Sequence, residues 1–243
     1  MKKIKFLMMA AVALLTASTF VACGDDDDDS KGGQPSNMER YQQEVDATVK
    51  SQKKNDKAIL VVAFGSTWQQ AYDAFDLTVE EYKKEFPGYD VYLSFSSAIC
   101  INRAMAGEHV KPRNFYEPKY WLEAFGRVQY KEIIVQSMQV IPGEEYTRVI
   151  NAMKDFANNS NGDLDDKYLS TMTLKLGYPL MAEYPSDVNK LAKALNDNFS
   201  SYAQKGALLF MGHGNPDTYD TYKANVRYTQ LETALKVYSS NYY

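Results

Sequence analysis

The stretch AILVVAFGST, residues 58–67, runs from seven apolar residues into a glycine and two hydroxyl residues. A continuous apolar run that ends at glycine is typical of a central parallel strand, which is covered on both faces. We therefore expect residues 58–64 to form a buried strand. The helical spacing of apolar residues in 70–86 predicts a helix directly after it.

The same alternation continues along the chain. Apolar runs predict four further strands, at 91–97, 132–138, 168–177 and 207–212. Helical spacing predicts further helices at 99–106, 117–128, 186–202 and 216–238, and one that starts after Pro142-Gly143. The pattern indicates an α/β fold, a doubly wound and mostly parallel sheet with helices on both faces. Right-handed crossovers bring the carboxyl ends of such strands to one edge, where ligands bind.

One later stretch repeats the first. Residues 208–222, LLFMGHGNPDTYDTY, follow the pattern of residues 59–75, ILVVAFGSTWQQAYDAF. The alignment places Gly214 opposite Gly65 and His213 opposite Phe64. A strand, a glycine turn and a helix start are thus used twice, with a histidine in only one copy.

His213 is one of two histidines in the chain and lies in a loop expected at the carboxyl edge. An imidazole there can bind a metal such as Co²⁺, Ni²⁺, Fe²⁺ or Zn²⁺, move a proton near neutral pH, or satisfy a buried hydrogen bond. The flanking glycines favour the first two uses, because they let a ligand approach the backbone. The other histidine, His109, lies in a polar loop, and we expect it to be solvated.

Two further groups are expected at this edge. Glu145 begins a helix, where it either complements the positive end of the helix dipole or serves as an acid, base or ligand. The turn of Gly65, Ser66 and Thr67 offers backbone N–H groups and two hydroxyls to an anionic ligand.

Residues 1–22 have the pattern of a secretory signal peptide, with three lysines before an apolar stretch at 6–20. The segment FVAC, residues 20–23, resembles a bacterial lipobox. We expect Cys23 to be lipidated and to anchor an exported protein to a bacterial membrane, on the periplasmic side or the cell surface. The alternative is an ordinary cleaved signal followed by an incidental cysteine.

The remaining chain divides by composition. Residues 23–55 contain five consecutive aspartates and read as an acidic tether with a polar lead-in. We expect a first α/β unit at 58–205 and the start of a second, incomplete unit at 206–243. The net charge is −4, and without the three lysines of residues 1–22 it is −7. The five aspartates supply −5 of this, so the folded part is close to neutral and has no basic stripe that would suggest nucleic acid as a partner.

The blocks ILVVAFGST, FSSAI, IIVQSMQVIPGEEY and LLFMGHG, in this order, resemble the anaerobic-type sirohydrochlorin cobaltochelatase family, which has the class II chelatase fold. The resemblance covers about residues 58–238. It implies that Co²⁺, with Fe²⁺ or Ni²⁺ as other options, is inserted into a tetrapyrrole in anaerobic cobalamin biosynthesis, without an organic cofactor. In this family two similar α/β units face each other across a cleft, which fits the internal repeat.

The resemblance also implies roles for individual residues. His213 becomes a metal ligand and proton acceptor, and Glu145 a second metal and proton residue. The carboxylates of the tetrapyrrole would meet the turn at residues 65–67, with Arg103 as a charge partner.

Two departures from the family pattern stand out. Gln139 occupies a position where the family usually has a histidine, and the chain stops at Tyr243, before the family's remaining metal ligands. We therefore expect a C-terminally truncated relative, and its oligomeric state, including a homo-oligomer, stays open. The alternative function is a non-catalytic tetrapyrrole- or metal-binding surface lipoprotein. Export favours this alternative, because cobalamin synthesis is cytoplasmic.

Overall fold

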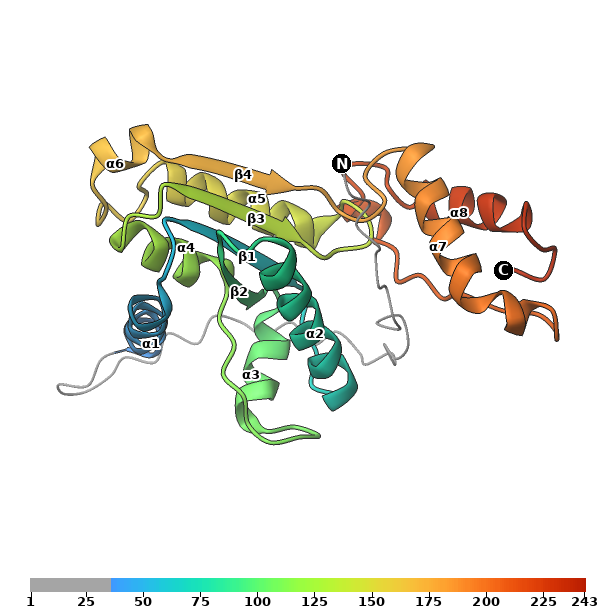
Figure 1. The fold of residues 1–243 in the computed structure, drawn as a ribbon, viewed down its shortest axis with the longest axis horizontal. Helices are drawn as coiled ribbons and strands as arrows, with labels where there is room; N and C mark the ends of the chain where they lie inside the picture. Colours follow the sequence, from blue (N-terminus) through green and yellow to red (C-terminus); the bar gives the residue numbers. More distant parts are fainter. Residues whose placement is uncertain (1–35) are drawn as a thin grey trace.

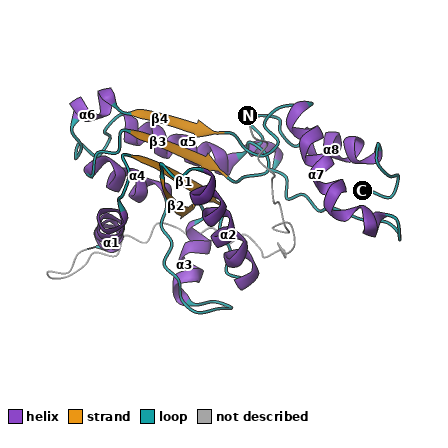
Figure 2. Cartoon of the chain, in the orientation of Figure 1, coloured by secondary structure: helices purple, strands orange, loops and turns teal. Residues whose placement is uncertain are grey.

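The computed structural model describes residues 36–243, so the predicted signal peptide, the lipidation of Cys23 and the five aspartates lie outside the described residues. The strands form one four-stranded sheet in the order β2–β1–β3–β4, and every neighbouring pair is parallel. They are β1 (Lys57–Ala63), β2 (Asp90–Phe95), β3 (Glu132–Ser137) and β4 (Thr173–Gly177). Figure 2 shows them as one orange layer. The predicted parallel α/β fold is confirmed.

Eight α-helices are described within residues 36–243. They are α1 (Asn37–Gln52), α2 (Gln69–Glu85), α3 (Ala98–Ala106), α4 (Pro118–Arg127), α5 (Glu144–Ala157), α6 (Asp166–Thr171), α7 (Ser186–Ala203) and α8 (Val226–Lys236). None of these helices is both long enough and apolar enough to span a bilayer. The polar lead-in is a packed helix, because Ser36 and Glu39 form a capping box and α1 buries Val45 and Val49 completely.

Helices cover both faces of the sheet (Figure 1). Successive side chains of a strand point to opposite faces. In β1, Leu60 and Val62 therefore pack in one cluster with α1, α4 and α5. Ile59 and Val61 pack on the other face with α2. The apolar sequence of residues 58–63 in β1 follows from this double coverage.

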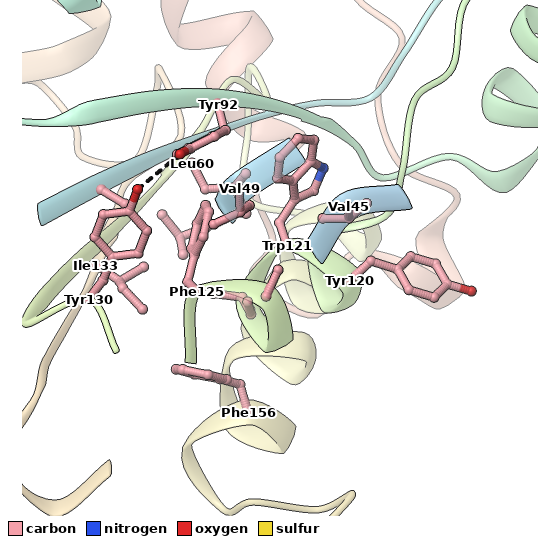
Figure 3. Packing of buried hydrophobic residues seen from close by; sticks show 14 of the residues in the cluster. Val45, Val49, Leu60, Tyr92, Tyr120, Trp121, Phe125, Tyr130, Ile133 and Phe156 are labelled. Carbon is pink, nitrogen blue, oxygen red and sulfur yellow. Dashed lines mark hydrogen bonds between the residues drawn. The ribbon is translucent and has the colours of Figure 1, made fainter. Parts of the chain in front are cut away.

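The largest core cluster is aromatic (Figure 3). The rings of Trp121 and Phe125, from α4, lie 5.2 Å and 5.0 Å from the ring of Tyr92 on β2. The Tyr92 hydroxyl bonds to the Tyr130 hydroxyl at 2.9 Å, which in turn donates to Asp90 at 2.6 Å. Asp90 is the first residue of β2, so this buried polar network lies at the amino end of the strands.

Residues 178–243, the C-terminal lobe, form a second core, to which Ile141 of the loop after β3 also contributes. Helices α7 and α8 pack on each other there, together with Leu208, Phe210 and Tyr242. Figure 1 shows this helix pair beyond the arrowheads of β3 and β4. The division of the chain at residue 205 stays a prediction, and α7 shares its core with α8 rather than with the sheet.

Three local predictions are wrong. Residues 207–212 do not form a fifth sheet strand. They make one bridge, between Leu208 and Tyr242, and leave Leu209 and Met211 exposed, because the sheet stops at β4. Between residues 216 and 225 a short 3₁₀ turn replaces the predicted helix. Residues 166–171, partly assigned to a strand, are helix α6, because Asp165 caps the Lys167 N–H.

Candidate functional site

Three loops lie side by side at the carboxyl edge of the sheet. They follow β1, β2 and β3, and the β2 and β3 loops both bond to β1. The Ser96 N–H donates to the Ala63 carbonyl at 2.9 Å, and the Met138 N–H donates to the Val62 carbonyl at 2.9 Å. The predicted meeting of the loops after β1 and β3 is therefore present, whereas the third loop predicted there, residues 212–217 with His213, does not follow a strand of this sheet.

Glu145 is the second residue of α5 and points its carboxylate at the loop after β2. Oε2 accepts a hydrogen bond of 3.2 Å from the Ser96 hydroxyl, and Oε1 lies 4.0 Å from Arg148 Nε. Burial raises the pKa of Glu145 above its usual value, although Arg148 and Ser96 oppose the shift. The carboxyl group therefore holds a proton more readily than a surface glutamate does.

His213 lies in the loop at residues 212–215 of the C-terminal lobe, and its side chain is exposed. Nδ1 is 2.7 Å from the Gly214 carbonyl oxygen. A carbonyl only accepts, so Nδ1 carries the proton, and in the neutral ring Nε2 is left with a lone pair for a metal ion. Among the influences on the pKa of Glu145, the charge of a protonated His213 is the weakest, and it acts to lower that pKa.

The turn at residues 65–67 has fewer polar groups available to a ligand than the sequence predicts. Gly65 has φ +120°, and a Cβ there would lie 2.7 Å from the Cβ of Cys100, so this position favours glycine. The Ser66 hydroxyl accepts the Trp68 N–H at 3.2 Å. Thr67 is buried, and its hydroxyl lies 3.0 Å from Nδ1 of His109. Both hydroxyls already have partners within the protein.

His109 is exposed, as predicted, but it also makes contacts within the protein. Its ring stacks on Trp68 at a centroid distance of 4.1 Å and an angle of 13°, with φ +67° at His109. The loop after α3 thereby covers the turn after β1. The third predicted anion partner, Arg103, pairs with Glu108 at 3.4 Å while its side chain remains 49% exposed.

The role of Ser96 is absent from the sequence predictions. Its only sequence signal is its place directly after an apolar strand. Gln139, which departs from the family pattern, accepts a hydrogen bond from the Ser137 hydroxyl, and its Nε2 is buried without a partner in the described part of the chain. Cys100, beside Gly65, is a free thiol whose pKa is raised by burial.

The internal repeat has a counterpart in backbone geometry. Gly65 and Gly214, which align in the two copies, both have positive φ, at +120° and +68°. L-residues with a side chain rarely adopt these values. Both copies therefore use glycine to turn the chain after an extended segment.

Within residues 36–243, no three His, Cys, Asp or Glu side chains form a group that could hold a metal ion. Glu145 and His213, the two residues predicted to bind a metal, therefore belong to no such group. Each has a side-chain atom of a type that binds divalent metals, a carboxylate oxygen and an imidazole nitrogen.

Comparisons with known proteins show the family of the chain. A family model described as cobalt chelatase (CbiK) matches residues 57–242. The chain is 25% identical over 159 residues to the sirohydrochlorin cobaltochelatase of Salmonella typhimurium strain LT2, which covers 65% of this chain and 54% of that protein. It is 30% identical over 161 residues to the sirohydrochlorin cobaltochelatase CbiKC of Nitratidesulfovibrio vulgaris strain Hildenborough. This match covers 65% of this chain and 51% of that protein. The chain thus spans about half the length of these curated relatives.

Proposed function

This chain belongs to the cobalt chelatase (CbiK) family, and from that premise we propose that it inserts Co²⁺ into sirohydrochlorin. The observations that carry the proposal are the family match across the sheet and the C-terminal lobe, and the packing of Asn215 on Gly143, which lie two residues from His213 and Glu145, respectively. The proposal assigns the carboxylate of Glu145 and the imidazole of His213, from different lobes, to one Co²⁺ ion.

The reaction exchanges one ion for two protons. Co²⁺ forms bonds to the four macrocycle nitrogens, and two pyrrole N–H bonds break, so two protons leave and the total charge is conserved. The protein needs a metal site weak enough to release the ion and a base that accepts protons. A site with two protein ligands meets the first requirement.

His213 and Glu145 share these tasks. Nε2 of His213 binds the ion, since Nδ1 is engaged by the Gly214 carbonyl. Glu145 contributes an oxygen to the ion, and as the ion moves to the macrocycle the freed carboxylate takes one pyrrole proton and the freed Nε2 of His213 takes the other. Its raised pKa suits this step. The Ser96 hydroxyl orients the carboxylate.

The substrate carboxylates lie against the turn of Gly65, Ser66 and Thr67 and against Arg103. Because the two hydroxyls are engaged, the turn contributes mainly backbone N–H groups. Arg103 keeps about half of its side chain exposed and can exchange Glu108 for a substrate carboxylate.

The protein acts outside the cytoplasm, tethered to a bacterial membrane through a lipid on Cys23. This part of the proposal rests on the sequence of residues 1–23 alone. The tetrapyrrole would then meet the protein on the periplasmic side or the cell surface.

A second candidate is a protein that binds a tetrapyrrole or a metal ion without turnover. It is favoured by the exposure of His213 and by the two-ligand site. Anaerobic titrations with Co²⁺, sirohydrochlorin and both together distinguish the candidates. Insertion changes the absorption spectrum of the macrocycle at a rate proportional to protein concentration. A binding protein gives a saturable shift that stops at one equivalent.

A further inference from the structure

The two proposed metal ligands lie in different parts of the molecule. Glu145 is on α5, which packs on the sheet, whereas His213 is in the loop of residues 212–215 in the C-terminal lobe. The His213 ring does not fix this loop, because its ring bonds only to the adjacent Gly214 in the described part of the chain. Another group must hold the loop if both side chains are to share one ion.

Asn225 holds the loop from the start of α8. The backbone N–H of Asn215 donates to Oδ1 of Asn225 at 2.7 Å, and Nδ2 of Asn225 donates to the Asn215 carbonyl at 2.8 Å. One side-chain amide thus satisfies both backbone groups of a residue two positions after His213. Paired bonds of this kind fix position and orientation together.

Neighbouring residues fix the position of Asn225 and of the loop. The carboxylate of Asp220 accepts the N–H groups of Ala224 at 2.7 Å and of Asn225 at 3.2 Å. The ring of Tyr228 lies against Gly212, where a Cβ would be 2.3 Å from the ring. Its hydroxyl accepts the Gly214 N–H at 3.4 Å. The loop is therefore held on both sides of His213.

The held loop also touches the start of α5. A Cβ at Gly143, the N-cap of α5, would lie 2.1 Å from Oδ1 of Asn215. The Asn215 amide therefore packs directly on the backbone at Gly143, two residues before Glu145. A continuous set of contacts runs from Asn225 through Asn215 to the helix that carries Glu145.

We propose that Asn225 is a positioning residue that holds the 212–215 loop against Gly143 and thereby sets the separation of His213 and Glu145. This inference rests on the proposed function, in which those two side chains bind one Co²⁺ ion. Asn225 itself does not touch the ion. Without its amide the loop remains attached but takes many positions, so the ion meets both ligands less often.

The test compares Asn225→Ala with Asn159→Ala. Asn159 makes the same pair of bonds to one residue, with Nδ2 3.0 Å from the Leu164 carbonyl and the Leu164 N–H 3.1 Å from Oδ1, but it follows the other end of α5. Co²⁺ affinity is measured on the metal-free protein by calorimetry. Asn225→Ala should weaken binding by about tenfold, equivalent to ~1.4 kcal/mol. Asn159→Ala should bind as the parent does.

A second variant approaches the contact from the other side. Gly143→Ala pushes its new methyl group into the Asn215 amide, so it should also weaken Co²⁺ binding while Asn225 is intact. Equal affinities of the parent and Asn225→Ala, or equal losses in Asn225→Ala and Asn159→Ala, would overturn the positioning role.

A readout without metal separates this inference from the proposed function. The chain has two histidines, so a His109→Ala background leaves one imidazole signal to follow by NMR. In Asn225→Ala the relaxation of the His213 ring should show increased motion, and in Asn159→Ala it should not. Unchanged relaxation defeats the positioning role. A parent protein that neither binds nor inserts Co²⁺ defeats the proposed function instead.

Discussion

The Ser96 hydroxyl lies 3.2 Å from Oε2 of Glu145, and this bond joins the loop after β2 to the start of α5. Burial disfavours the charged carboxylate, whereas the bond from Ser96 favours it. Burial is the larger effect, so the pKa of Glu145 is raised. The loop after β2 and the start of α5 thus hold a carboxyl group that is costly to ionise.

This cost predicts that Glu145→Gln stabilises the protein at neutral pH. A carboxyl group whose folded pKa is raised contributes stability below its unfolded pKa, and the contribution is lost as the pH rises through the folded value. Urea unfolding should therefore show Glu145→Gln to be more stable than the parent at pH 7, with the difference shrinking toward pH 4. The exposed neighbour Glu144, which pairs with Arg148 at 2.6 Å, is the control, and Glu144→Gln should give no gain. A loss of stability in Glu145→Gln at pH 7 would contradict the burial argument.

The lowered pKa of Asp90 predicts a pH dependence of stability opposite to that of Glu145. Burial raises the pKa of Asp90, but hydrogen bonds from Tyr130, Asn55 and Lys54 outweigh burial and hold it below its usual value. The stability that Asp90 supplies is present above its unfolded pKa and is lost as the pH falls through the folded value. Asp90→Ala should lower the free energy of unfolding by about 2–4 kcal/mol at pH 7.

The measurement for Asp90 is urea unfolding of the parent and the variant between pH 7 and pH 3. The difference between them should narrow as the pH falls. Asp197→Ala, which removes an exposed ion pair with Lys193, should change stability by less than about 1 kcal/mol. A pH-independent loss in Asp90→Ala would mean that the carboxylate charge is not what stabilises the network.

Two leucines of the C-terminal lobe test the reassignment of residues 207–212. Leu235 on α8 is 2% exposed, and Leu209 is 73% exposed. Leu235→Ala should therefore cost about 2–5 kcal/mol of unfolding free energy, whereas Leu209→Ala should cost less than about 0.5 kcal/mol. A large loss of unfolding free energy in Leu209→Ala would contradict this and would support the buried strand that the apolar run predicted.

The lipid anchor is tested at Cys23. The protein made with its own leader in a bacterial host should partition into detergent and incorporate labelled palmitate. Cys23→Ser should do neither, and Cys100→Ser, which keeps the lipobox-like segment, should behave as the parent does. Release of the parent into the soluble fraction with an unmodified cysteine would refute lipidation.

Much of the fold follows from local sequence. Apolar runs bounded by glycine and polar residues predict β1, β2 and β3 within one or two residues, because strands covered on both faces need mostly apolar side chains at their centres. The same pattern gives a wrong prediction at residues 207–212. An apolar run does not show whether the folded chain offers a neighbouring strand with which it can pair. At 166–171 the capping residue Asp165 was the overlooked signal.

Sequence patterns predict the candidate site less completely than the fold. Loop positions after β1, β2 and β3 follow from the parallel topology, and with them the place of Glu145. The contacts of Ser96 with Glu145 and of His109 with Thr67 join residues 49 and 42 positions apart, and no periodicity encodes such pairs. The hold of Asn225 on the loop of residues 212–215 depends on a bend of the chain before α8 that the predicted continuous helix would not allow.

The central claim is that His213 binds the Co²⁺ ion that is transferred to the macrocycle. Its most direct measurement is the initial rate of the Co²⁺-dependent absorption change of sirohydrochlorin under anaerobic conditions, for the parent and for His213→Ala, with His109→Ala as the control for loss of a histidine. The account predicts that His213→Ala lowers the rate at least about a hundredfold and that His109→Ala stays within a few-fold of the parent. Insertion by His213→Ala at the parent rate would contradict it.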